Sequence, residues 1–91
     1  MTIYTYCILY KDRVIYVGKT MSLKRRINRH HHNFKSCRFP LYKYMRNESV
    51  NVKKDFVFSI LETNQTNLEA HFSERYWIKL YKPICNKQIP K

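Results

Sequence analysis

A short polar break near the start of the chain is the feature that most constrains its fold. Lys11-Asp12-Arg13 separates two runs of β-branched and aromatic residues, 3–10 and 14–17. Runs of this composition predict β-strands, and so short a break between them predicts a β-hairpin. An antiparallel pair of strands is therefore expected before any helix.

The length of the hairpin turn decides which side chains share a face of the sheet. A two-residue turn would pair Tyr6 with Val17 and put Tyr6 and Tyr16 on opposite faces. An odd-length turn centred on Asp12 would put both tyrosines on one face. If both tyrosines are functional, we expect the odd-length turn.

The single glycine of the chain, Gly18, follows the second run. It falls where that strand must turn into a helix, a place where a positive φ or the close approach of a ligand requires glycine. Thr20 or Ser22 can then cap a helix that runs to about residue 32 or 34. The apolar stripe of this helix consists of Leu23, Ile27 and Phe34.

Three more elements are expected downstream. Pro40 can begin a second helix that runs to about residue 46. Its inward-facing residues are expected to be Leu41, Tyr44 and Met45. Residues 55–61 are apolar and aromatic, which is typical of a central strand covered on both faces. Thr66-x-x-Glu69 is a capping box for a last helix that ends near residue 81, before Lys82-Pro83.

The charge of the chain favours a polyanionic partner. Its 91 residues are expected to form one domain, and 18 Lys and Arg against six acidic residues give a net charge of +12. So strong a positive field on a small domain indicates nucleic-acid contact rather than a merely solubilising surface. A membrane partner is disfavoured, because no apolar run reaches about 18 residues and no signal peptide is visible.

Cysteine and histidine usage favours neither disulfides nor a zinc site. The three cysteines form no C-x-x-C pair, which indicates an intracellular, reducing compartment such as the cytoplasm or nucleus. His30, His31 and His32 are consecutive. Because successive helical residues point about 100° apart, at most one or two of them can reach the same zinc ion.

One carboxylate is expected on the apolar face of the last helix. On a helical wheel Glu74 falls in the middle of the arc formed by Ala70, Trp77, Ile78 and Tyr81. A carboxylate there must be paired, protonated or bound to a cation, because an unpaired buried charge costs several kcal/mol. The pairing partner would be Arg26 in a structural ion pair, or a metal ion. With six acidic residues in the chain, one Mg²⁺ ion is better supported than a two-metal site.

Arginine and histidine on the first helix are candidates for phosphate contact. Arg26 offers a planar, permanently charged group suited to a phosphate and its transition state. It can equally be one more surface arginine beside Arg25 and Arg29. His30, one turn later, can hydrogen-bond the same phosphate, orient a tyrosine or sit satisfied in the core.

Tyr6 and Tyr16 are either ordinary strand aromatics or parts of an active site. A tyrosine acts as a general base only if its pKa is pulled well below about 10. The positive charges of Lys19, Arg26 and a bound metal ion could lower the pKa of a nearby tyrosine in this way.

In their order along the chain, these residues resemble the motifs of the GIY-YIG nuclease family. Tyr4-Thr5-Tyr6 stands at the first tyrosine motif and keeps only its final residue, and Tyr16-Val17-Gly18 matches the second. The family's other motif positions fall on Lys19, Arg26, His30, Glu74 and Asn86. The resemblance covers roughly residues 4–86.

The resemblance implies a fold and a function. The fold would be α+β, a small three-stranded antiparallel sheet flanked by helices in the order β-β-α-α-β-α. The function would be a DNA endonuclease that leaves 5′-phosphate, with one Mg²⁺ or Mn²⁺ on Glu74 and catalytic roles for Tyr6, Tyr16, Arg26 and His30. Residues expected to bind DNA or support the site are Gly18, Lys19, Arg25, Arg29 and Asn86.

Several features of such a nuclease stay open at this point. Its DNA preference would be structural or weakly sequence-specific, and specificity could come from self-association or a partner. DNA repair or recombination, in a phage or viral setting, would suit so compact a form. The alternatives are a non-catalytic nucleic-acid-binding module of the same fold and a basic protein-interaction subunit.

Overall fold

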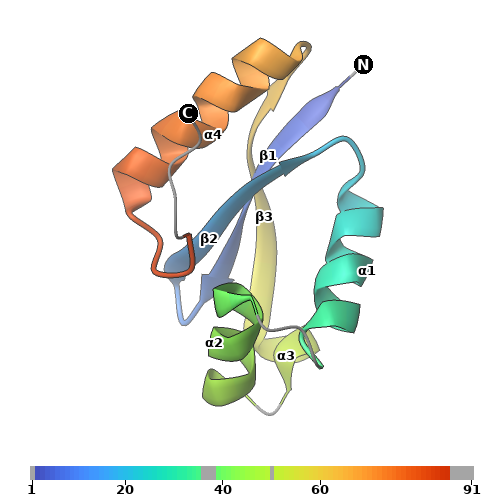
Figure 1. The fold of residues 1–91 in the computed structure, drawn as a ribbon, viewed down its shortest axis with the longest axis vertical. Coiled ribbons are helices and arrows are strands. Elements are labelled where there is room, and N and C mark those ends of the chain that lie inside the picture. The colour runs from blue at the N-terminus through green and yellow to red at the C-terminus, as the bar shows by residue number, and fades with distance from the viewer. Residues whose placement is uncertain (1, 36–38, 50, 87–91) are drawn as a thin grey trace.

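The computed structural model describes residues 2–35, 39–49 and 51–86. In these ranges the elements are β1 (Ile3–Tyr10), β2 (Arg13–Thr20), α1 (Leu23–Asn33), α2 (Pro40–Glu48), α3 (Val52–Asp55), β3 (Phe56–Asn64) and α4 (Asn67–Tyr81). The strands form one antiparallel sheet in the order β2-β1-β3. Helix α4 lies on one side of the sheet, with α1 and α2 on the other (Figure 1). The predicted α+β architecture is confirmed, and the one-turn helix α3 is an addition to it.

Tyr6 and Tyr16 lie on the same face of the sheet, as expected, but the turn of the hairpin is not the expected one. Its turn has two residues, Lys11 and Asp12, with positive φ of 53° and 62°. The odd-length turn was therefore the wrong prediction. The pairing shifts by one residue between Ile8 and Leu9 of β1, which leaves an extra residue in β2. This bulge turns the rest of β2 over and places Tyr16 on the same face as Tyr6.

The extra residue in β2 is Ile15, because Val14 pairs with Leu9 while Tyr16 pairs with Ile8. Its side chain is fully buried. A bulge normally disrupts the local pairing and bends the strand. Here the backbone carbonyl of Ile15 accepts a hydrogen bond from the N–H of Cys85, at 2.9 Å.

Gly18 lies within β2, because the strand continues to Thr20 rather than ending at residue 17. Its φ is not positive, so the predicted strand-to-helix turn at this glycine was wrong. A Cβ atom at position 18 would lie 2.7 Å from the hydroxyl oxygen of Tyr6 and 3.0 Å from the ring of Tyr16. The chain needs glycine here because two tyrosine side chains cross its backbone.

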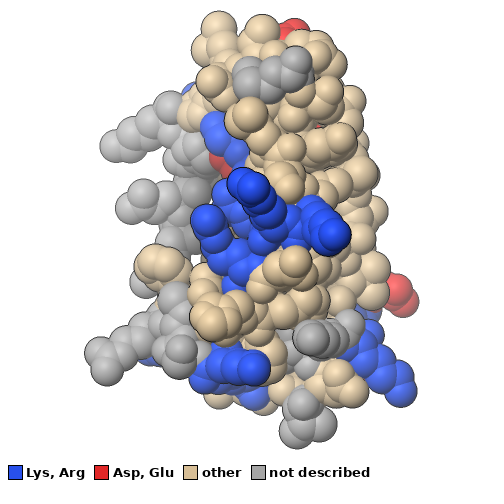
Figure 2. All heavy atoms as spheres, turned by 90° about the vertical axis from the view of Figure 1, so that its right-hand side faces the viewer, with Lys and Arg blue, Asp and Glu red and all other residues tan. Residues whose placement is uncertain are grey.

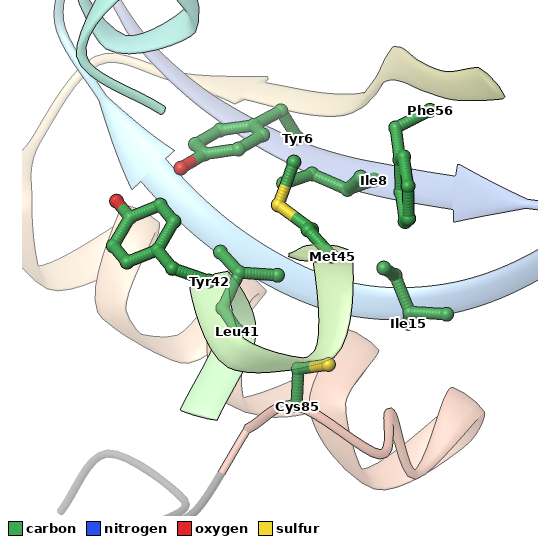
Figure 3. Packing of buried hydrophobic residues seen from close by; sticks show 8 residues of the cluster. All are labelled: Tyr6, Ile8, Ile15, Leu41, Tyr42, Met45, Phe56 and Cys85. Atoms are coloured by element: carbon green, nitrogen blue, oxygen red, sulfur yellow. The ribbon is translucent and has the colours of Figure 1, made fainter. Parts of the chain in front are cut away.

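The main core fills the space between the sheet and α2. Figure 3 shows the side chains of this cluster, with the rings of Tyr6 and Tyr42 extending toward the same end of it. Its fully described members are Tyr6, Ile8, Ile15, Leu41, Tyr42, Met45, Phe56 and Cys85. A second, smaller cluster on the opposite face joins Cys7 and Val17 to Ile78 of α4.

The strand predicted at 55–61 is an edge strand, not a central one. In the sheet order β2-β1-β3, the central position belongs to β1. Val57 and Ile60 on β3 are consequently about half exposed, at 55% and 51%. The apolar run had suggested cover on both faces, but the covering helices do not reach these two side chains.

The helix boundaries follow local capping signals. Ser22, not Thr20, caps α1 by accepting a hydrogen bond from the N–H of Arg25. Thr66 and Glu69 form the predicted capping box at the start of α4. In α2 the buried residues are Leu41, Tyr42 and Met45. Tyr44, which was predicted to face inward, is partly buried and packs against the main core, whereas Tyr42 is buried and was not predicted. No helix among the described residues is long and apolar enough to span a bilayer.

Candidate active site

Three buried side chains form a hydrogen-bonded chain beneath the site. The Tyr6 hydroxyl is 2.7 Å from Nε2 of His30, and Nδ1 of His30 is 2.9 Å from the Tyr42 hydroxyl. Nδ2 of Asn33 also donates to the Tyr42 hydroxyl, at 3.4 Å. Strand β1 supplies Tyr6, while α1 and α2 supply the other residues. The sheet and both helices on this face are thus joined by one polar network.

The environment of this network keeps its members uncharged. Burial, helped by the nearby charge of Arg26, lowers the pKa of His30 to about 4. Burial also raises the pKa of Tyr6 far above its ordinary value, with a smaller contribution from Tyr16. A neutral imidazole has one donor and one acceptor nitrogen, so one of its two tyrosine neighbours donates and the other accepts. Neither Tyr6 nor His30 carries charge at neutral pH.

Tyr16 is the tyrosine of the pair that reaches solvent. Its ring is half-buried, whereas that of Tyr6 is fully buried. It is held 6.3 Å from the ring of Tyr6 and 5.8 Å from that of His30, measured between centroids. Its pKa is raised mainly by burial and then by the negative charge of Glu74, and Arg26 opposes this shift.

Glu74 extends from α4 toward the same group of residues. Its carboxylate is half-buried, and burial raises its pKa while the charges of Lys19 and Arg26 oppose the rise. Within the part of the chain that the structure describes, no hydrogen bond or ion pair joins this carboxylate to another side chain. The suggested structural ion pair with Arg26 is therefore not formed among these residues, although the two charges influence each other.

Asn86 fastens the tail to the edge of the sheet beside these residues. Its Oδ1 accepts a hydrogen bond from the N–H of Val17 at 2.8 Å, and its Nδ2 donates to the carbonyl of Val17 at 2.9 Å. The side-chain amide thus occupies the place of a neighbouring strand on the free edge of β2. Asn86 therefore holds the backbone of β2 at Val17, the residue between Tyr16 and Gly18.

Two pockets flank Arg26, which lines both. We call the first, of about 450 Å³, the basic pocket. Its charged lining residues are Lys19, Arg25, Arg26 and Arg29. Figure 2 shows Lys and Arg side chains gathered in the middle of the face that α1 occupies in Figure 1. The structure therefore brings Arg25 and Arg29 next to the site, with Arg25 on its basic side.

We call the second, of about 440 Å³, the aromatic pocket. The predicted site residues that line it are Tyr16, Arg26, Arg29 and His30. Phe39 and Tyr42, which were not predicted as site residues, line its other end. Tyr42 was hidden among eight tyrosines, and the one available signal was its spacing one residue after Leu41 and three before Met45.

The donor set of this site fits a single hard cation. Among residues 2–35, 39–49 and 51–86, no three His, Cys, Asp or Glu side chains gather as a ready-made metal cage. Mg²⁺ does not require one, because it is commonly held by one or two carboxylates, water and substrate phosphate oxygens. The carboxylate of Glu74, which has no hydrogen-bond or ion-pair partner in the described ranges, is suited to this type of binding.

One of three comparisons with known proteins gave a match. The family model described as GIY-YIG catalytic domain matches residues 2–88, nearly the whole sequence given. The searches of curated proteins and of solved structures gave no match. GIY-YIG domains are nuclease domains that generally use divalent metal ions and act on DNA. The chain therefore belongs to the GIY-YIG family.

Proposed function

We propose that this protein is a metal-dependent DNA endonuclease that hydrolyses a phosphodiester bond and leaves a 5′-phosphate. The observation that carries the proposal is the half-buried carboxylate of Glu74, which has no partner among the described residues and faces the charges of Lys19 and Arg26. A carboxylate held this way is costly unless a cation joins it. A divalent ion would be that cation, and the phosphate oxygens of the DNA would be among its other ligands.

Arg26 is proposed to bind the scissile phosphate. It lines both pockets, as Arg29 does, but Arg26 is the arginine whose charge acts on Tyr16 and on Glu74. Its planar fork can hold two phosphate oxygens and stabilise the additional negative charge of the transition state. Lys19 adds positive charge on the basic side.

Tyr16, rather than Tyr6, is proposed to receive the proton of the attacking water. Without a metal ion, burial and then Glu74 raise the pKa of Tyr16 instead of lowering it, so the lowering expected from its neighbours is not reached by Arg26 alone. A divalent ion bound at Glu74 would offset the charge of that carboxylate and so favour the phenolate. Tyr16 lines an open pocket, whereas Tyr6 is fully buried and its hydroxyl is engaged with His30. A new bond forms between water oxygen and phosphorus as the bond to the 3′ oxygen breaks, and the 3′ oxygen is then protonated from solvent. Tyr6 and His30 act by positioning Tyr16. We expect a rise of the cleavage rate with pH, because the phenolate is the active form.

A divalent ion bound at Glu74 would supply positive charge to the phosphate and to the leaving oxygen. Glu74 would bind the ion, and its position is set by α4, whose first turn is fixed by the capping box. We propose Mg²⁺ or Mn²⁺ as the ion, because both prefer oxygen ligands.

The first experiment compares the wild-type protein with Glu74→Ala and Glu48→Ala. Glu48 is an exposed glutamate on α2 and gives the same change in charge away from the site. With Mg²⁺ or Mn²⁺, we expect Glu74→Ala to cut supercoiled plasmid and branched DNA at least about a hundredfold more slowly. Its DNA affinity should stay within a few-fold of wild type, and Glu48→Ala should behave as wild type.

Two outcomes would contradict the proposal. Equal loss of cutting and binding in a folded Glu74→Ala protein would remove the metal-binding role of the residue. DNA binding without products under any divalent ion would indicate the non-catalytic module instead. Tyr16→Phe should abolish the rise of rate with pH and Tyr6→Phe should retain it, so the reverse result would exchange their roles.

A further inference from the structure

The aromatic pocket contains a residue that the proposed chemistry does not use. Phe39 lines this pocket and is 67% exposed. It occupies the N-cap of α2, where its side chain forms no capping hydrogen bond. Ser, Thr, Asp and Asn are the residues that stabilise a helix at this position. A phenylalanine here contributes neither a cap nor a buried core side chain.

The ring of Phe39 continues a line of rings that begins at the site. Ring centroids are 6.4 Å apart for Phe39 and Tyr42, 5.7 Å for Tyr42 and His30, and 5.8 Å for His30 and Tyr16. The aromatic pocket runs along these rings. A molecule bound at Tyr16 and Arg26 therefore has a contiguous aromatic wall beside it that ends at an exposed ring.

The charge around the pocket selects an anionic ligand with a planar group. Arg26 and Arg29 line it, and none of its described lining residues is acidic. Its volume of about 440 Å³ lies within the range of small-ligand sites. A nucleotide combines the two features, because its phosphate suits the arginines and its base suits the rings. A base paired and stacked inside a duplex cannot enter such a pocket.

We propose that the aromatic pocket binds an unstacked nucleobase next to the scissile phosphate, with Phe39 stacking on the base. The inference rests on the proposed nuclease function and assigns its substrate class. The preferred DNA has an unpaired nucleotide at the cut, as in a flap, branch or single-stranded gap. Extrusion of a base costs least where that base is already unpaired.

The test is a double-mutant cycle that combines a change at Phe39 in the protein with removal of a base from the DNA. Wild type, Phe39→Ala and Phe39→Trp are each given a flap substrate and the same flap with an abasic nucleotide next to the mapped cut, on either side. Stacking of a base on an aromatic side chain corresponds to a factor of about ten or more in affinity. We expect wild type to lose about tenfold in kcat/KM on the abasic flap at one of the two positions.

Phe39→Ala should lose a similar factor on the intact flap and nothing further on the abasic one. Phe39→Trp should restore sensitivity to the missing base. The matched control is Phe72→Ala, which truncates a similarly exposed phenylalanine on α4 outside this pocket and should leave both rates unchanged. Two outcomes would overturn the proposal. In the first, Phe39→Ala and the abasic nucleotide reduce kcat/KM independently, so that their factors multiply. In the second, wild type cuts the intact and the abasic flap equally well.

Binding constants for the same proteins and DNAs separate this inference from the nuclease proposal. If wild type cuts nothing but the cycle appears in affinity, the nuclease proposal fails and the base-binding pocket stands. If cutting occurs and the cycle is absent from both readouts, the pocket proposal fails alone. Thermal unfolding of each variant checks that the exposed position 39 tolerates the change.

Discussion

At the scale of single residues, His30 shows how burial limits chemical roles. Both of its ring nitrogens lie within hydrogen-bonding distance of tyrosine hydroxyls, from Tyr6 and Tyr42. It is neutral over the physiological pH range because burial lowers its pKa to about 4. It is therefore not a second positive charge for the phosphate beside Arg26. Its effect on the reaction passes through the tyrosine rings that it holds.

The lowered pKa of His30 predicts a pH dependence of stability. The unfolded chain binds a proton at His30 near pH 6.5, whereas the folded chain does so near pH 4. The unfolded state therefore gains protons first as pH falls through this window, and stability falls with it. Between pH 7 and 5 the loss should be about 2 kcal/mol. Urea unfolding of wild type and His30→Gln at several pH values measures it.

The difference between the two proteins isolates His30 from the other histidines and the carboxylates. The His30→Gln protein is expected to be less stable at neutral pH, but its unfolding free energy should change less between pH 7 and 5. Curves that stay parallel over this interval would show that His30 is not held neutral by the fold.

At the scale of elements, the bulge in β2 decides the geometry of the site. The two-residue turn alone would leave Tyr16 facing α4, away from Tyr6. The extra residue Ile15 reverses the facing, and its carbonyl accepts a hydrogen bond from Cys85 in the tail. Asn86 then pairs with Val17 through its side chain. Strand β2 is thus held in its bulged register from both of its edges.

The crossing of Tyr6 over β2 predicts the result of Gly18→Ala. The added methyl group would lie 2.7 Å from the Tyr6 hydroxyl oxygen and 3.0 Å from the Tyr16 ring. Tyr6 cannot move aside easily, because it is fully buried and bound to His30. We expect a loss of about 1–3 kcal/mol in unfolding free energy. Cleavage should fall further than binding, because Tyr16 is displaced as well.

A double-mutant cycle between Gly18→Ala and Tyr6→Phe checks the cause of that loss. Removal of the hydroxyl relieves part of the clash, so the double variant should be more stable than the sum of the single losses predicts. Strict additivity would mean that the methyl group acts on the strand backbone and not on Tyr6.

Elements with local signals could be predicted from the sequence, and those set by distant pairing could not. The capping box of α4 is a local signal and was predicted, and Ser22 was one of the two residues predicted as the cap of α1. The bulge and the edge position of β3 depend on partners far along the chain. Tyr42 illustrates a second limit, because on a wheel it and Tyr44 lie about 80° to either side of the mean direction of Leu41 and Met45. The spacing alone could not distinguish them.

The residues of the candidate site also fall into two groups, those that the sequence predicted and those that only the structure identifies. The residues of the motif order, Tyr16, Arg26 and Glu74 among them, were named from the sequence, and the structure brings their charges within reach of one another. Phe39 carries no motif and is defined as a pocket residue by its exposure beside Tyr42. Exposure is a property of the folded surface, so residue type and spacing give no access to it.

At the scale of the whole molecule, four of the 18 Lys and Arg residues behind the +12 charge line one pocket beside the site. Lys and Arg gather on the face that α1 occupies, around the basic pocket (Figure 2). Glu74 lies at the border of this region, as its interactions with Lys19 and Arg26 show. A DNA backbone drawn to the positive face is thereby delivered to the carboxylate and its tyrosine neighbours.

This placement predicts which cations set the salt dependence of DNA binding. Each phosphate contact with duplex DNA contributes about −0.9 to the slope of log K against log salt. Replacement of Arg25 and Arg29 by Gln should therefore reduce the slope by up to about 2. The control replaces Lys54 and Lys79, which are exposed and line neither pocket beside α1. It removes the same charge, and its slope should stay near that of wild type. Equal reductions in both proteins would mean that the general field of the molecule, and not contacts on the α1 face, holds the DNA.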